Sequence, residues 1–191
     1  MEEKILIRLS NHHCHLNEET VEKLFGKKEL TFERSLNGAD LVAYKETITV
    51  KGPKGSIEKI RVLGPLRKYN QVELLVADNY KLGVKAPVCM SGDLNDAVEL
   101  TLSGPCGEIS DKCGIVAARH IHMFTGEAER LGITNNQKVR VAVEGERGLV
   151  FENVQVKVSP KEVDIPVLMH IDTEEGNAAG ITSNTNGIMI L

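Results

Sequence analysis

The sequence has no tryptophan and few aromatic side chains, with four phenylalanines and three tyrosines among 191 residues. So few rings argue against the stacking platforms that read single-stranded nucleic acid. Positive charge is also scarce, because 23 Lys and Arg residues face 27 Asp and Glu residues, a net charge of −4. A broad basic nucleic-acid surface is therefore not expected, and an anionic substrate would need local cations or metal ions.

Long apolar runs and targeting signals are missing as well. No run approaches the roughly 20 apolar residues that cross a membrane, and the start of the chain has no signal-peptide core. The glycine fingerprints of Rossmann and P-loop sites are absent. The four cysteines form no Cys-x-x-Cys pair, which argues against a four-thiolate zinc site. We expect reduced thiols, inert at Cys106 and Cys113, in a soluble cytoplasmic protein that binds neither membrane nor nucleic acid.

What the sequence does contain is a series of short strands. Residues 4–9 alternate, with Ile5, Ile7 and Leu9 on one face. Further β-like runs cover residues 41–50, 57–62, 72–76, 139–143 and 149–158. Short helices are predicted after the Asn17 cap up to Gly26, over residues 125–131, and for a turn or two near Asp93. With no long amphipathic helix, this pattern favours a barrel or sandwich over a parallel βαβ sheet.

All six histidines fall in three short patches: His12-His13-Cys14-His15, His120-Ile121-His122, and His170. In a strand, residues i and i+2 point to the same face, so each His-x-His pair could chelate one metal ion. One such pair alone is more often a surface or hydrogen-bonded pair, but two pairs and a further histidine favour metal, zinc above all where a carboxylate joins them. His12 would face away, as a structural or exposed residue.

Two other polar segments carry candidate chemistry. Arg67 could hold a phosphate through two parallel hydrogen bonds. Gln71 and Glu73 share a face if they lie on a strand, and Glu73 could then be a metal ligand or a base. A solvated turn and strand edge is the alternative, which the local pattern alone favours. Ser91 in Ser91-Gly92-Asp93 fits a helix cap better than an anion-binding nest.

Taken together, these patches resemble the PduL-type phosphotransacylases, also called phosphate propanoyltransferases. The matching motifs cover nearly the whole chain: Ser10-Asn11-x-His13-x-His15-Leu16, Gly64-Pro65-x-Arg67-x-x-x-Gln71-Val72-Glu73, Ala86-Pro87-Val88, Ser91-Gly92-Asp93-Leu94, Gly104-Pro105, Ala118-Arg119-His120-Ile121-His122-Met123 and His170-Ile171-Asp172-Thr173-x-Glu175-x-Asn177-Ala178-Ala179-Gly180. Each motif alone is weak, whereas the combination is specific.

The resemblance implies a mainly β fold of two small β-barrels capped by short α-helices, with the first strand joining the C-terminal barrel. One barrel would comprise residues 1–11 and 119–191, the other residues 12–118, with the active site between them. Two divalent metal ions, usually zinc, are implied. Their ligands would be His13, His15 and Glu73 for one ion and His120, His122 and His170 for the other. Arg67 would be catalytic and hold phosphate, and Ser10 and Asn177 would lie near coenzyme A.

The implied activity converts a short-chain acyl-CoA, propanoyl-CoA or acetyl-CoA, and phosphate into acyl phosphate and CoA. Phosphate would attack directly, in a homodimeric enzyme of the kind linked to propanediol degradation in bacterial microcompartments. Position 12 is His where the family usually has Arg, and position 14 is Cys where it usually has Val. Only nine residues precede Ser10, so we expect no microcompartment-targeting extension and a free cytosolic enzyme, with entry by partner binding left open.

A second interpretation is a non-catalytic ligand-binding module. Residues 127–158 resemble the double-psi barrel of molybdopterin-binding and decarboxylase-like proteins. In that case the histidines would be scattered and structural. Metal content separates the two interpretations, since only the enzyme needs about two zinc ions per chain.

Overall fold

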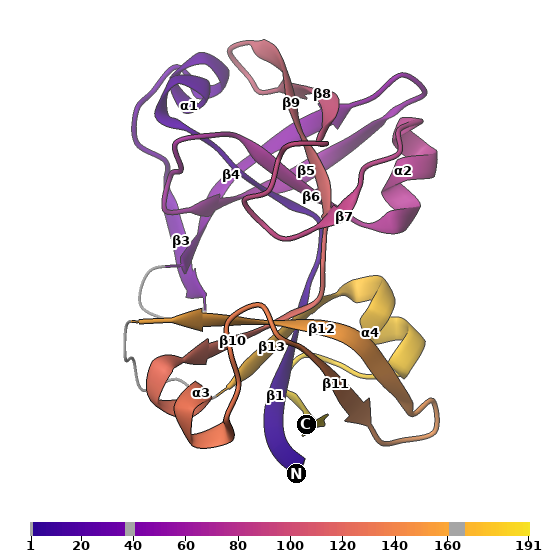
Figure 1. Ribbon diagram of the computed structural model, residues 1–191. Coiled ribbons are helices and arrows are strands. Elements are labelled where there is room, and N and C mark those ends of the chain that lie inside the picture. The colour runs from indigo at the N-terminus through magenta and orange to yellow at the C-terminus, as the bar shows by residue number, and fades with distance from the viewer. Residues whose placement is uncertain (1, 37–40, 161–166) are drawn as a thin grey trace. The chain divides into compact units, whose positions relative to one another are not determined.

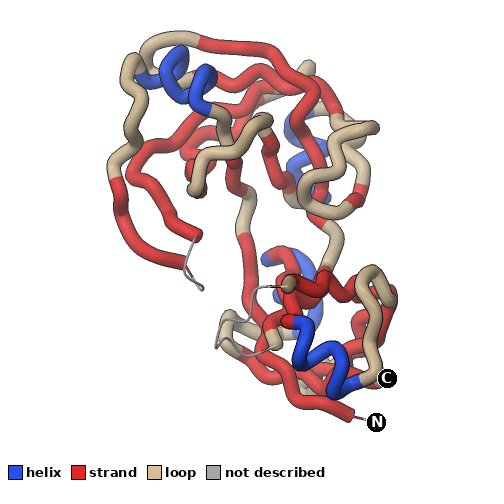
Figure 2. Tube along the Cα trace, turned by 60° about the vertical axis from the view of Figure 1, so that its left-hand side comes forward, coloured by secondary structure: helices blue, strands red, loops and turns tan. Residues whose placement is uncertain are grey.

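The structure is a computed structural model that describes residues 2–36, 41–160 and 167–191. The chain divides into two compact units (Figure 1). The terminal unit comprises Met1–Asn11 and Ala118–Leu191, and the middle unit comprises His12–Ala117. Strands make up most of both units, with short helices between them (Figure 2). The prediction of a mainly β fold is confirmed.

The terminal unit is a closed barrel with the strand order β1-β13-β10-β12-β11-β14. β1 lies between β13, which runs parallel to it, and β14, which runs antiparallel. The predicted entry of the first strand into the C-terminal barrel is thereby confirmed. The strands are β1 (Glu2–Ser10), β10 (His120–Phe124), β11 (Lys138–Val143), β12 (Leu149–Ser159), β13 (Leu168–Asp172) and β14 (Thr185–Ile190), and the helices are α3 (Thr125–Leu131) and α4 (Thr173–Ala179).

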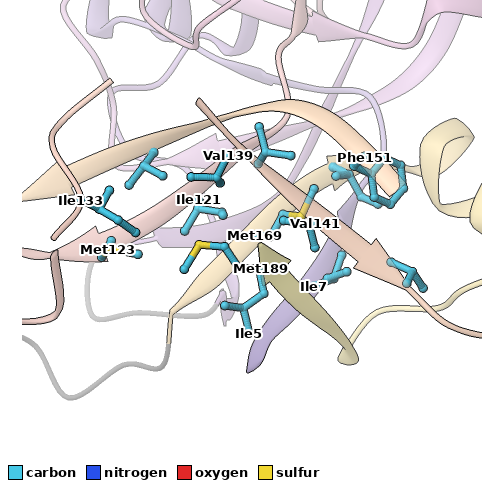
Figure 3. Packing of buried hydrophobic residues seen from close by; sticks show 14 of the residues in the cluster. Ile5, Ile7, Ile121, Met123, Ile133, Val139, Val141, Phe151, Met169 and Met189 are labelled. Carbon is cyan, nitrogen blue, oxygen red and sulfur yellow. The ribbon is translucent and has the colours of Figure 1, made fainter. Parts of the chain in front are cut away.

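Strict alternation explains why these strands close around one core. In β1, Ile5 and Ile7 are buried and meet Met169 and Met189 from the neighbouring strands (Figure 3). The residues between them point to the outer face of the barrel, because successive side chains of a strand alternate. β10 and β13 follow the same rule and therefore present their histidines outward.

The middle unit holds the second barrel. β4, β5, β2, β6, β9 and β8 pair in a ring, since β8 pairs with both β9 and β4. β3 extends β4, and β7 extends β9. The elements are β2 (His13–His15), α1 (Glu18–Phe25), β3 (Phe32–Leu36), β4 (Leu41–Lys51), β5 (Ser56–Gly64), β6 (Gln71–Leu74), α2 (Val76–Leu82), β7 (Val88–Cys89), β8 (Val98–Ser103) and β9 (Glu108–Ala117).

Local sequence signals set several boundaries as predicted. Asn17 caps α1 by accepting a hydrogen bond from the backbone N–H of Thr20 at 2.8 Å. Gly26 ends the same helix in the left-handed conformation that glycine adopts without strain. The helix over residues 125–131 and the hairpin of β11 and β12 are also confirmed.

Two local predictions are wrong. The strand expected up to Val76 stops at Leu74, and Val76 begins α2, because Asp78 accepts the backbone N–H of Leu75 as a helix cap does. No helix starts near Asp93, where the chain makes turns instead. In the part of the chain that the structure describes, no helix is long and apolar enough to cross a membrane.

Candidate metal centres

Two neighbouring strands of the middle unit bring together His13, His15 and Glu73, named here the middle cluster. In the antiparallel pair of β2 and β6, His13 lies opposite Glu73, and Cys14 between the histidines is fully buried in the core. The His13 Nε2 atom lies 3.4 Å from Glu73 Oε2, and His15 Nε2 lies 4.0 Å from Oε1. One ligand atom from each residue falls within 4.8 Å of the other two.

Glu73 is held by hydrogen bonds rather than exposed at an edge. Its Oε1 accepts from Gln71 Nε2 at 2.7 Å and from Ser91 Oγ at 2.9 Å. Burial raises the pKa of Glu73, but His13, His15, Ser91 and Arg67 outweigh it and hold the pKa below its ordinary value. The solvated strand edge favoured by the local pattern is therefore wrong, since β6 is paired on both sides.

Arg67 lies directly beside this cluster. Its Nη2 donates to His15 Nε2 at 3.0 Å, and its Nη1 lies 3.3 Å from Ser91 Oγ. A guanidinium only donates, so His15 Nε2 is the acceptor and carries no proton. Burial, then His13 and Arg67, lower the pKa of His15 to about 3. The cluster thus keeps a neutral imidazole, the form that binds metal.

The terminal unit brings together His120, His122 and His170, named here the terminal cluster. β10 pairs antiparallel with β13, with His120 opposite His170. The ring centroids lie 4.8 Å apart for His120 and His122, 5.4 Å for His120 and His170, and 5.1 Å for His122 and His170. The three ligand nitrogens lie within 4.8 Å of one another.

The protonation of this second cluster also suits a metal ion. His120 Nδ1 donates to the backbone oxygen of Ala118 at 2.9 Å, which leaves the Nε2 lone pair directed at His122 Nε2, 3.1 Å away. Burial, His120 and Lys157 lower the pKa of His122 to about 4. Converging imidazoles are a donor set that zinc prefers. Both clusters therefore fit a divalent transition metal.

The remaining predicted site residues lie in the terminal unit. Ser10 ends β1 and lies opposite Asp172 of β13. His170 lies two residues before Asp172 and therefore on the same outer face of the barrel. Asn177 is exposed on α4, which Asp172 caps by accepting from the Glu175 backbone N–H. His12 is half-buried, and its Nδ1 lies 3.0 Å from Asp78 Oδ2 on α2, in keeping with a structural role.

Sequence reasoning misjudged Ser91. A helix cap was favoured, yet its hydroxyl donates to Glu73, and the next residue, Gly92, donates its backbone N–H to Gln71 Oε1 at 2.7 Å. No local signal could reveal this, because 18 residues separate Ser91 from Glu73. The resemblance includes this segment but assigns no role to Ser91.

Comparison with known proteins finds relatives that align with nearly the whole chain. Residues 6–182 match the family described as phosphate propanoyltransferase. The chain is 46% identical over 185 residues to the phosphate propanoyltransferase of Priestia megaterium, covering 96% of this chain and 84% of that protein. It is 44% identical over 183 residues to the one of Rhodobacter capsulatus (93% and 82%) and 42% identical over 178 residues to the one of Salmonella typhimurium (92% and 83%).

Proposed function

This chain belongs to the phosphate propanoyltransferase family and is an acyltransferase, and we propose that it transfers the acyl group of propanoyl-CoA or acetyl-CoA to phosphate with the help of two metal ions. The observation that supports this most strongly is that each unit brings three potential metal-ligand atoms within 4.8 Å of one another. That both clusters serve one reaction is part of the proposal.

Arg67 is the phosphate-holding group in this proposal. Its two terminal nitrogens form a fork that matches two phosphate oxygens, and its backbone N–H donates to the oxygen of Leu16 at 2.9 Å, which fixes the loop that carries it. Holding phosphate beside the thioester replaces a collision between two anions with a positioned attack. A phosphate oxygen then bonds to the carbonyl carbon, the carbon–sulfur bond breaks, and the thiolate of CoA leaves.

The ligands are His13, His15 and Glu73 for one metal ion and His120, His122 and His170 for the other. Bound there, zinc or a similar ion would supply Lewis-acid stabilisation of negative charge on phosphate, the carbonyl oxygen and the thiolate. Gln71 and Ser91 keep the carboxylate of Glu73 turned toward the two imidazoles.

Direct attack needs no protein nucleophile, and three of the four cysteines support this. Cys14 and Cys113 are buried, and burial raises the pKa of both thiols. Burial and Asp93 likewise raise the pKa of Cys89. Thiols held in the protonated form are poor nucleophiles.

Other parts of the proposal concern binding and assembly. Ser10, at the end of β1, and Asn177, on α4, contact coenzyme A. The protein is a homodimer, and it works free in the cytoplasm or enters a bacterial microcompartment by binding a partner.

A thiol-release assay tests the activity directly. Acetyl-, propanoyl- and butanoyl-CoA are each mixed with enzyme and phosphate, and free CoA is followed with and without a chelator. We expect phosphate-dependent release that the chelator abolishes and zinc restores, with about two zinc ions per chain. Full turnover by the metal-free protein contradicts the metal-assisted mechanism, and a stable acyl-enzyme burst contradicts direct attack.

A further inference from the structure

Arg8 lies next to the terminal cluster, on the neighbouring strand. Ile7 and Leu9 on either side of it pack into the terminal-unit core (Figure 3 labels Ile7 there), so Arg8 belongs to the outer face of the barrel. The parallel register of β1 and β13 sets Arg8 directly opposite His170. Adjacent strands lie about 4.8 Å apart, which makes Arg8 the next side chain in the row that contains His170 and His120.

The guanidinium of Arg8 is unusual because two of its nitrogens are buried without a partner. Nε and Nη1 are both shielded from solvent, and neither has a hydrogen-bond acceptor among residues 2–36, 41–160 and 167–191. A guanidinium stays charged at every relevant pH, so donors that lose water and gain no acceptor destabilise the fold. Other arginines in the described part of the chain differ: Arg61 donates to backbone oxygens and Arg119 pairs with Glu175.

The electrostatics around Arg8 call for an anion. The terminal cluster is made of imidazoles, with no carboxylate in the group. Across it, on β12, the register sets Lys157 beside His122. Two cationic residues therefore flank the three histidines on four adjacent strands, in a protein whose net charge is −4. These two cationic residues, with two unsatisfied donors on Arg8, fit a ligand that carries several acceptor oxygens and negative charge.

We propose that Arg8 is a substrate-binding residue whose buried guanidinium donates to the oxygens of a phosphate group beside the terminal cluster. This inference rests on the proposed function, because phosphate groups come from inorganic phosphate, from acyl phosphate or from CoA. Phosphate oxygens that accept from Nε or from Nη1 give these buried donors the acceptors they lack. The two unsatisfied donors destabilise the free protein, and bound substrate removes this destabilisation. Such a cost in stability is typical of binding residues.

The test compares Arg8→Met and Arg8→Lys with the matched control Lys4→Met. Lys4 lies on the same strand and the same face but is exposed, so its variant loses the same charge without touching buried donors. Binding of inorganic phosphate and of CoA is measured separately by calorimetry on the metal-loaded protein. KM and kcat are measured by thiol release, together with metal content and the melting temperature.

We expect Arg8→Met to weaken the affinity for phosphate, for CoA or for both by about tenfold to a hundredfold, with the corresponding KM raised. Whichever ligand loses affinity identifies the source of the phosphate group. Metal content should stay the same, the melting temperature should be unchanged or higher, and Arg8→Lys should restore part of the affinity. Lys4→Met should match the wild type within twofold.

The inference is overturned if Arg8→Met binds both ligands within twofold of the wild type. It is also overturned if Arg8→Met loses stability or metal while folded Arg8→Lys binds both ligands as the wild type does. A purely structural role predicts a lower melting temperature in Arg8→Met. A wild-type protein that releases no CoA from any acyl-CoA contradicts the proposed function instead, and calorimetry with phosphate still tests Arg8 in that case.

Discussion

The middle and terminal clusters differ in charge and in how their ligands are held. The middle cluster contains one carboxylate, Glu73, fixed by two side-chain hydrogen bonds. The terminal cluster contains imidazoles alone. With neutral histidines and the same divalent ion, the middle centre would carry one positive charge and the terminal centre two. With metal bound, the terminal centre would therefore attract anions more strongly, whereas the carboxylate ligand of the middle cluster is oriented by two hydrogen bonds.

The largest expected effect comes from removing one ligand in each cluster. His15→Ala and His122→Ala should each lose one bound metal ion and lower kcat by about a thousandfold or more, since each centre stabilises charge in the same step. Metal analysis and thiol release measure this. If both clusters serve one reaction, the double variant should be scarcely slower than either single variant, whereas fully multiplied losses would assign the clusters to separate functions.

Acid should destabilise the metal-free protein through the same histidines. The pKa of His15 is lowered to about 3 and that of His122 to about 4 by burial first, against about 6.5 in the unfolded chain. The unfolded chain therefore takes up protons first as the pH falls. The free energy of unfolding is therefore unaffected by these histidines above about pH 6.5. It falls as the pH decreases, down to about pH 4 for the effect of His122 and about pH 3 for that of His15.

Urea unfolding at pH 7, 5.5 and 4.5 measures this loss, which should reach about 4 kcal/mol for the pair between pH 6.5 and 4.5. His15→Leu and His122→Leu should each remove about half of that pH dependence. An unchanged slope in either variant would show that the imidazole in question does not stay neutral in the folded protein.

Arg67→Ala should act on phosphate rather than on metal. Loss of a bidentate, charge-assisted contact is expected to lower kcat/KM for phosphate by about a hundredfold while metal content stays the same. Arg67→Lys keeps the charge without the fork and should recover only part of the activity. Steady-state kinetics at saturating acyl-CoA test this, and near-normal turnover of Arg67→Ala would refute the role of the residue.

Ser91→Ala should weaken the middle centre alone. Glu73 would lose one of its two side-chain donors, and the loss of such a ligand-orienting bond lowers metal affinity by about tenfold or more. Competition with a chelating dye measures the affinity of each centre. Ser110→Ala is the control, because that hydroxyl bonds Thr101 on an exposed part of the same unit, away from Glu73. Equal weakening of both centres would contradict the separation of the two clusters.

Periodicity and resemblance predicted different parts of the molecule. Spacing alone placed His13 with His15 and His120 with His122, because the i, i+2 rule depends only on local strand geometry. The capping signals at Asn17 and Gly26 were equally local. The pairing of β1 with β13 and β14, by contrast, joins residues from opposite ends of the chain, and it was predicted only through the resemblance.

Features that depend on distant neighbours escaped prediction from the sequence. The local pattern alone favours a solvated edge for Glu73, because nothing near it shows that β2 and β9 flank its strand, and its place among the metal ligands is predicted only through the resemblance. Val76 continued an apolar run, and the cap that makes it helical depends on Asp78. Arg8 shows the same limit, since alternation places it on the outer face, where solvent is the ordinary neighbour, yet two of its nitrogens are buried.

The smallest expected effect is at Lys157. Replacing this residue should change the metal affinity of the terminal cluster and leave that of the middle cluster unchanged. Lys157 is exposed and contributes to the lowered pKa of His122, so its charge also opposes a cation bound there. Lys157→Met should tighten metal binding at the terminal centre by about twofold to fivefold at low salt, the range expected for one exposed charge. At about 1 M salt the effect should vanish, since screening shortens the reach of the charge to about 3 Å.

The middle centre should not respond at either salt concentration. A gain that persists at high salt would mean that Lys157 acts by packing against the histidines rather than through its charge.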